Sequence, residues 1–209
     1  MDGQSYLNEI SMANRPAPKS KMNFMKSKFF LVGAIGVVGL ILMALIGAIV
    51  GGNKADIKEQ TVTLKVRLDN ISGVVKEYQP SIKSSVLRSN SASLYSVMSN
   101  TSRELGEYLE ITYNFKDKSI PERIENDESA HRDELYNELF NAEINGLLDR
   151  TFTYNIIYEI SLITTMERRI QNAAGNDTLK GIMETSIESL TNIYDSLNNY
   201  SETSNSGGL

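Results

Sequence analysis

A single apolar run most limits how this chain can fold. Residues 29–50 read FFLVGAIGVVGLILMALIGAIV, 22 residues without a charge, an amide or a hydroxyl. As a helix, this run would rise about 33 Å at roughly 1.5 Å per residue, enough to cross a bilayer's hydrocarbon core of about 30 Å. We therefore expect a transmembrane helix over residues 29–51. No later run is comparably apolar, so we expect the chain to cross the membrane once.

The charges before this run indicate its orientation. Residues 1–28 carry five lysines and arginines against two acidic residues, whereas the whole chain has a net charge of −5. Because basic residues beside a membrane helix are retained in the cytoplasm, we expect residues 1–28 to form a disordered cytoplasmic tail. We then expect residues 52–209 to lie on the extracytoplasmic side of the membrane. A cleaved signal peptide is the competing interpretation, but its apolar region has only about 7 to 15 residues.

Small residues within the apolar run suggest a helix-pairing face. Gly47 and Gly51 are four residues apart, and Ala44 and Ala48 repeat that spacing. Small residues at this spacing let two membrane helices approach closely, although glycine is also common in membrane helices that do not pair. We name these four residues as candidates for helix pairing in the membrane.

The cytoplasmic tail contains a candidate interaction site. Tyr6, Leu7 and Ile10 fall on one side of a helical turn, where a partner could bind them. This Tyr-Leu-Asn-Glu-Ile tail, its proline- and lysine-containing spacer and the glycine-rich apolar helix resemble the N-terminal layout of uncharacterised single-pass membrane-anchored proteins of ultrasmall candidate-phylum bacteria. The resemblance covers residues 5 to about 51. It implies a location in the cell envelope and implies no activity.

Beyond the apolar run, the pattern is that of amphipathic helices. Apolar residues recur at alternating spacings of four and three from Ile57 to Ile82, as in a heptad repeat, with one polar interruption at Thr61. Residues 61–68 also alternate as a strand would, but the longer heptad favours a helix. This stripe should join either the core of a bundle or a second copy of the chain. Its candidate residues are Ile57, Leu64, Leu68, Ile71 and Val75.

Interruptions of the pattern predict where the first helices end and begin. Pro80 breaks the stripe, so one helix should end near Tyr78 and the next should begin at residues 79–81. One continuous, kinked helix is the alternative. Ser119 and Glu122 have the spacing of a capping box, which predicts the start of a third helix.

The third helix should be long. Its apolar stripe continues to Ile170 across Gly146, where we expect a bend. Gly175 then predicts a helix C-cap and either Asn176 or Asp177 an N-cap, and the last helix should end at Tyr200.

Four amphipathic helices must bury their stripes against one another. We therefore expect an all-α fold, in which residues 54–200 form an extracytoplasmic up-and-down four-helix bundle or an elongated helical hairpin. A disordered tail should follow over residues 201–209.

The composition excludes most catalytic sites. With no cysteine and a single histidine, the chain has no thiol nucleophile and no site built from two imidazoles. Glu128 and His131 match the ExxH unit of di-iron bundles, but that family needs a second ExxH. We interpret the acidic segment around His131 as a solvated helix face, and we expect no metal, no cofactor and no enzymatic activity. Four residues of this segment share one face: Asp127, His131, Glu134 and Glu138.

Together these features predict a membrane-anchored interaction protein of the cell envelope, with a structural, adhesion or complex-assembly role. Its partners should be the lipid bilayer and either another protein or a second copy of the chain. The alternative is a sensory, ligand-binding helical bundle that signals through a partner. The acidic charge disfavours nucleic acid, and no small-molecule substrate is expected.

Overall fold

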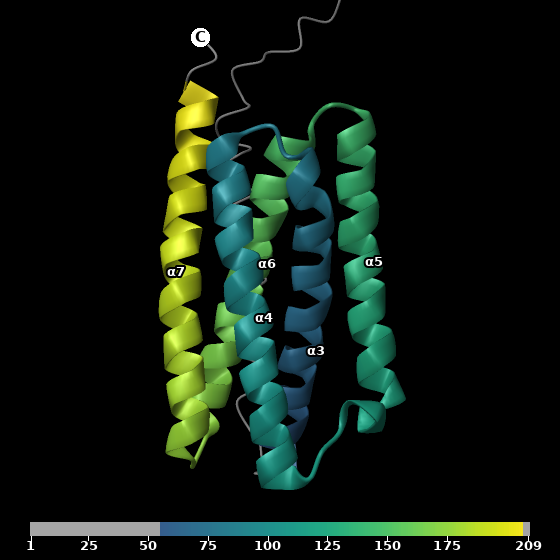
Figure 1. Ribbon diagram of the computed structural model, residues 1–209, viewed down its shortest axis with the longest axis vertical. Coiled ribbons are helices and arrows are strands. Elements are labelled where there is room, and N and C mark those ends of the chain that lie inside the picture. Colours follow the sequence, from purple (N-terminus) through teal and green to yellow (C-terminus); the bar gives the residue numbers. More distant parts are fainter. Residues whose placement is uncertain (1–54, 207–209) are drawn as a thin grey trace, which may run out of the picture. The chain divides into compact units, whose positions relative to one another are not determined.

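The computed structural model describes residues 55–206, which form five α-helices and two short 3-10 helices (Figure 1). The chain divides into two units, residues 1–51 and 52–209, and the described residues belong to the second. No strand occurs in the described range, so the all-α fold is confirmed and residues 61–68 are helical. The elements are α3 (Ala55–Tyr78), η2 (Gln79–Ser81), α4 (Ser85–Tyr113), η3 (Asp117–Ser119), α5 (Glu122–Ile144), α6 (Leu148–Ala173) and α7 (Asp177–Ser206).

The expected transmembrane helix over residues 29–51 lies outside the described residues. Between residues 55 and 206, none of the helices combines the length and the apolar character needed to cross a bilayer. The candidate pairing and tail residues also lie outside the described part of the chain: Ala44, Gly47, Ala48, Gly51, Tyr6, Leu7 and Ile10.

The five helices run alternately up and down, so that neighbours in sequence are antiparallel (Figure 1). Four of them form a ring in which α3 packs against α4, α4 against α7, α7 against α6, and α6 against α3. The fifth helix, α5, packs on the outside of this ring against α3 and α6. The described residues therefore contain a four-helix ring with one added helix, rather than four helices alone.

Helix α3 occupies the centre, because it contacts α4, α5 and α6. Val62 and Val66 share one of its faces, while Leu64 and Leu68 share another, and all four side chains are buried. Because α3 has neighbours on several sides, apolar residues on two of its faces are buried. This explains why apolar and polar residues alternate over residues 61–68 as they would in a strand. In the candidate stripe, Leu64, Leu68, Ile71 and Val75 are fully buried within this one chain, and Ile57 is partly buried against the same core.

The first two helices are separate, as the break at Pro80 predicted. Helix α3 ends at Tyr78, and η2 separates it from α4, which rules out one kinked helix. A helix starts in the predicted region, but α5 begins at Glu122, two residues after the start that a capping box on Ser119 implies, and the capping box does not form. Ser119 lies in η3, and Pro121 occupies the N-cap position without a side-chain cap.

The expectation that Gly146 only bends a long helix is wrong, because Gly146 ends α5. Its φ of 71° is in the left-handed region, which glycine adopts at little cost. The Leu147 N–H donates to the Ala142 carbonyl at 2.8 Å, and the Gly146 N–H donates to the Glu143 carbonyl at 3.0 Å. These two bonds form a Schellman motif, which stops the helix and turns the chain back. The single predicted stripe is therefore divided between α5 and α6.

The end of the chain also departs from the prediction. Gly175 does not adopt the left-handed conformation, and Ala174 is the C-cap of α6. Of the two predicted N-cap candidates, Asn176 caps α7, since its Oδ1 accepts from the Thr178 N–H at 2.7 Å. Helix α7 continues to Ser206, so residues 201–206 are helical rather than disordered.

Candidate functional site

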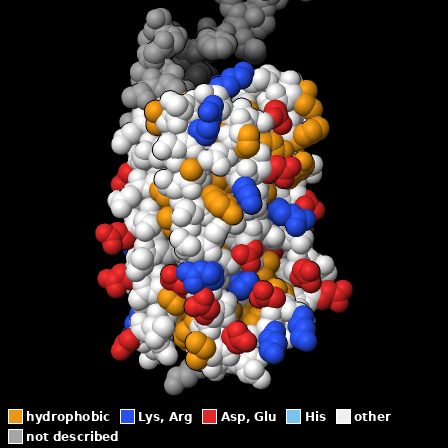
Figure 2. Space-filling model, in the orientation of Figure 1, with side chains coloured by type: hydrophobic (Ala, Val, Ile, Leu, Met, Phe, Trp, Pro, Cys, Tyr) orange, Lys and Arg blue, Asp and Glu red, His pale blue; other side chains and the backbone are white. Residues whose placement is uncertain are grey.

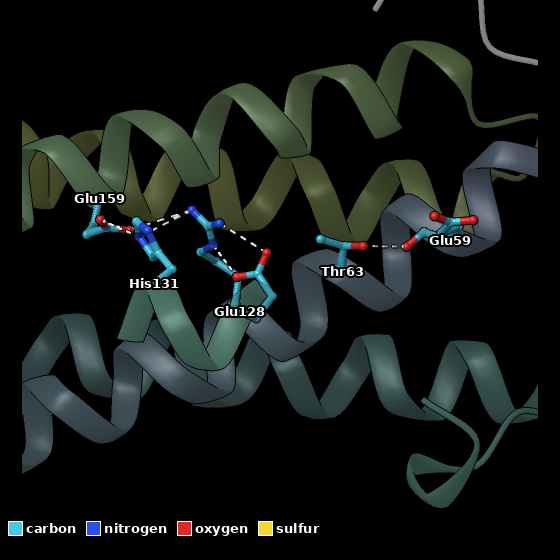
Figure 3. A network of polar contacts seen from close by, with 6 residues as sticks. Glu59, Thr63, Glu128, His131 and Glu159 are labelled. Carbon is cyan, nitrogen blue, oxygen red and sulfur yellow. Dashed lines mark hydrogen bonds and ion pairs between the residues drawn. The ribbon is translucent and has the colours of Figure 1, made fainter. Parts of the chain in front are cut away.

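Four charged or ionisable side chains meet between α3, α5 and α6 (Figure 3). Arg67 comes from α3, Glu128 and His131 come from adjacent turns of α5, and Glu159 comes from α6. We call these four residues the charged network. Both carboxylates are buried, with 4% of Glu128 and 3% of Glu159 exposed. Buried charges of this kind require close partners, because removing an ion from water costs several kcal/mol.

Arg67 and Glu128 form the strongest pair in the charged network. The Arg67 Nε donates to Glu128 Oε2 at 2.5 Å, and Nη2 donates to Oε1 at 3.0 Å. This two-bond arrangement fits the planar guanidinium to the carboxylate and fixes both side chains. The positive charge of Arg67 is therefore matched by Glu128.

His131 links this pair to Glu159. Its Nε2 lies 2.8 Å from Glu159 Oε1 and 3.4 Å from Arg67 Nη1. A carboxylate oxygen can only accept, so we assign the Nε2 proton toward Glu159, which leaves Nε2 unable to accept from Arg67. The second oxygen of Glu159, Oε2, has no hydrogen-bond partner and lies 4.0 Å from Arg67 Nη1.

A groove of about 310 Å³ opens beside the charged network, between α5 and α6. Glu138 and Asn155 meet across it, with the Asn155 Nδ2 donating to Glu138 Oε2 at 2.7 Å. The lining contains three carboxylates, one imidazole and one phenol, and it contains no lysine or arginine. Its residues are His131, Glu134, Leu135, Glu138, Asn155, Tyr158 and Glu159.

The predicted acidic face is only partly solvated. Asp127, Glu134 and Glu138 are exposed, as expected. Glu128 is buried against Arg67, so the interpretation of this segment as a wholly solvated face is wrong at that residue. Within residues 55–206, no three His, Asp or Glu side chains are placed to hold a metal ion together.

A second buried polar group lies among α4, α6 and α7, and we call it the neutral network. Thr101 Oγ1 donates to Ser186 Oγ at 3.1 Å, and Ser186 Oγ donates to Glu167 Oε1 at 2.5 Å. Glu167 is completely buried. Burial raises the pKa of Glu167 to about 8, although the Ser186 hydrogen bond and the nearby Arg168 both act to lower it. This carboxyl is therefore mostly protonated at neutral pH.

Large apolar side chains are exposed on the C-terminal part of α5, in the turn that follows it and on the N-terminal half of α6. Five of the seven large exposed hydrophobic residues in the described range lie between residues 140 and 158. Figure 2 shows hydrophobic side chains gathered over the C-terminal part of α5, at the upper right of that view. Arg150 contributes to this surface, with its guanidinium carbon 5.8 Å from the centre of the Tyr154 ring. We call the five residues the hairpin patch: Phe140, Ile144, Leu147, Tyr154 and Tyr158.

Sequence reasoning missed three residues that carry these sites, namely Arg67, Glu159 and Glu167. Arg67 interrupts a strongly apolar segment, and both glutamates fall on the buried stripe of α6 that includes Ile156 and Ile163. Charged residues on an otherwise apolar helix face are the signal that would have indicated them, because such residues are rarely buried without partners.

Comparison of the chain with protein-family models, with curated protein sequences and with solved structures finds no match.

Proposed function

We propose that this chain is a membrane-anchored interaction protein whose helical bundle binds another protein outside the cytoplasm through the hairpin patch. The apolar run over residues 29–50 would serve as the anchor, and it ends five residues before the start of α3. No catalytic role is proposed for the bundle. Residues 54–200 would act as an extracytoplasmic scaffold for adhesion or complex assembly.

The hairpin patch is the observation that carries this proposal. Its four helical members form two pairs at a spacing of four, Phe140 with Ile144 on α5 and Tyr154 with Tyr158 on α6, so each pair shares a helix face. Large apolar and aromatic side chains with a nearby arginine are enriched at the centres of protein interfaces. Exposing them to water lowers solubility unless a partner covers them.

The test is a substitution within the hairpin patch of the full-length protein. Ile144 is 68% exposed, so Ile144→Glu should leave the fold intact. We expect this variant to lose the proteins that copurify with the wild-type chain from membranes, because a charge within an apolar interface must be desolvated without a partner. Protein copurification would be quantified by mass spectrometry, and self-association by light scattering.

Ile111→Glu is the matched control. Ile111 is 86% exposed and lies near the C-terminal end of α4, at the opposite end of the bundle from the hairpin patch (Figure 1). This variant should keep every partner. If Ile144→Glu and Ile111→Glu retain the same partners and the same oligomeric state as the wild type, the hairpin patch is not the interaction surface.

Anchoring is tested independently of the hairpin patch. We expect protease added to intact cells to digest residues 54–200 and to spare residues 1–28, as the excess of basic residues in the tail implies. Residues 54–200 that stay undigested, or a purified chain that starts after residue 51, would contradict the proposed topology.

A sensory, ligand-binding role is the second candidate function. The groove beside the charged network is the observation that favours it, because pockets with a few convergent polar groups are typical of ligand sites. In that role the bundle would bind its ligand outside the cytoplasm and would signal through a partner of the cytoplasmic tail.

A further inference from the structure

The groove between α5 and α6 has the chemistry of a site for a positively charged ligand. Three of its seven lining residues carry carboxylates, and none is a lysine or an arginine. The rim carboxylates, Glu134 and Glu138, are exposed, whereas Glu159 is buried. An acidic rim alone is typical of many solvated surfaces, so the buried carboxylate of Glu159 is what distinguishes this groove.

The charge of the network leaves Glu159 without a full counter-ion. Arg67 is engaged by Glu128 through two hydrogen bonds, and its Nη1 lies 4.0 Å from Glu159 Oε2, beyond hydrogen-bond distance. His131 donates to Oε1 but adds a positive charge only when both of its nitrogens are protonated. With neutral His131, the four residues carry a net charge of −1.

Glu159 Oε2 is therefore a buried acceptor that lacks a donor. Only 3% of Glu159 is exposed, and Oε2 has no hydrogen bond, although the residue lines the groove. A buried, unsatisfied oxygen of a charged group is costly, and a donor that reached it from the groove would remove that cost. A cationic donor would also balance the remaining negative charge.

We propose that this groove binds an organic cation, a primary ammonium or a guanidinium group, with Glu159 as its buried counter-ion. The cation donates to Glu159 at the floor of the groove and to Glu134 or Glu138 at the rim. The exposed ring of Tyr158 covers its hydrocarbon portion and attracts its charge. Tyr158 also belongs to the hairpin patch, but the proposed counter-ion is Glu159, which does not. The cation site therefore defines the ligand class for the sensory alternative.

An organic cation fits this arrangement better than a metal ion does. A metal ion requires several ligands within about 2.0 to 2.6 Å, and no three His, Asp or Glu side chains in residues 55–206 are so placed. An ammonium or guanidinium group instead carries several hydrogen-bond donors, so it can bind carboxylates that lie farther apart than the ligands of a metal ion. The groove volume of about 310 Å³ suits a small ligand or a single side chain.

The test uses full-length protein in detergent micelles and isothermal titration calorimetry at constant ionic strength. Agmatine and putrescine represent free amines, the acetylated and amidated tripeptide Gly-Lys-Gly represents a lysine side chain, and 1-pentanol is the neutral control. We expect binding of at least one cationic probe and none of 1-pentanol. Binding of the free amines identifies a small-molecule ligand, whereas binding of the tripeptide alone identifies a lysine of a polypeptide.

Three variants locate the site. Glu159→Gln keeps the size of the side chain and an acceptor for His131, and it should weaken cation binding by about tenfold or more, because a charge-assisted bond is lost. Glu134→Gln changes an exposed side chain, so it should fold normally and weaken binding by a smaller factor. Glu188→Gln, on the exposed face of α7, should bind as the wild type does.

Two results would overturn the proposal. One is that no cationic probe binds more tightly than 1-pentanol. The other is that cation binding is equal in Glu159→Gln, Glu134→Gln and Glu188→Gln, which would reveal a non-specific attraction to an acidic protein. Neither result bears on protein binding through Ile144, so failure here is distinguishable from failure of the interaction proposal.

Discussion

Glu159 and Glu167 lie eight residues apart on the same helix and are both buried, yet the fold accommodates them in opposite ways. Glu159 faces α3 and α5, where His131 Nε2 donates to Oε1 and the positive charge of the Arg67 guanidinium lies 4.0 Å from Oε2. Glu167 faces α4 and α7, where its hydrogen-bond partner is the hydroxyl of Ser186 and burial raises its pKa to about 8. One side of α6 thus packs its acid against a histidine and an arginine, and the other holds a mostly neutral acid.

This contrast separates the two sides of the bundle by role. The charged network, the groove and the hairpin patch all involve α5 or the face of α6 beside it. The neutral network joins three helices of the ring through uncharged hydroxyls. A carboxylate that lines a groove can attract a ligand, whereas a neutral buried acid chiefly affects stability, so we propose that function resides on the side of α5.

The largest expected effect comes from removing the only arginine of the charged network. In Arg67→Met, Glu128 and Glu159 stay buried without the arginine's positive charge. The free energy of unfolding should therefore fall by about 3 to 5 kcal/mol. Urea denaturation of the full-length chain in micelles, followed by circular dichroism, measures this loss.

Arg123→Met is the matched control for that loss. Arg123 also pairs a residue of α5 with one of α3, Glu59, but both side chains are more than half exposed. Its removal should cost less than about 1 kcal/mol, as for other exposed ion pairs. Equal losses in the two variants would mean that Arg67 contributes no more to the free energy of unfolding than the arginine of an exposed ion pair does.

The next effect is a pH dependence that arises from Glu167. The folded chain keeps the Glu167 proton up to about pH 8, whereas the unfolded chain releases it near the ordinary pKa of 4.5. The contribution of this group to stability is therefore fully present below pH 4.5 and declines as the pH rises to 8. The slope approaches about 1.4 kcal/mol per pH unit within that window.

Glu167→Gln isolates this contribution. The free energy of unfolding of the variant, minus that of the wild type, should rise with pH between 4.5 and 8 and stay constant outside that range. Urea denaturation at pH 4, 5, 6, 7 and 8 measures the difference, with Glu188→Gln as the control. A difference that does not change with pH would show that Glu167 is ionised in the folded chain.

A smaller effect is expected from the hydroxyl that bonds Glu167. Ser186→Ala leaves Glu167 Oε1 without its donor, so the free energy of unfolding should fall by about 1 to 3 kcal/mol. Ser189→Ala is the control, because the Ser189 hydroxyl donates only to the Thr185 carbonyl of its own helix. Thermal unfolding of the two variants in parallel measures the difference, and Ser186→Ala should lose more stability than Ser189→Ala. Equal losses would contradict a role for the Ser186 hydroxyl as the donor to Glu167.

Much of the helical architecture follows from local sequence signals. Heptad spacing identified α3 even where residues 61–68 resemble a strand, and the break at Pro80 placed the end of that helix at Tyr78. The division between α5 and α6 was not predicted, because a glycine inside an apolar stripe can bend, continue or end a helix. Only the left-handed φ of Gly146 and its Schellman bonds decide among these outcomes.

The charged network was less predictable, because its pairs join distant parts of the chain. Arg67 and Glu128 are 61 residues apart, and His131 and Glu159 are 28 apart. Local spacing placed Glu128 and His131 together on one helix, but it could not indicate which helix would cover them. Packing of α5 against α3 and α6 converts a segment that resembles a solvated acidic face into a partly buried ionic site.

Site-specific photocrosslinking in intact cells tests most directly whether function resides on the side of α5. A photoreactive amino acid would replace Ile144 in one sample and Ile111 in another, since both positions are exposed but lie at opposite ends of the bundle. We predict a discrete crosslinked protein from position 144 and none from position 111. A discrete product from position 111 alone, or from neither position, would contradict the account.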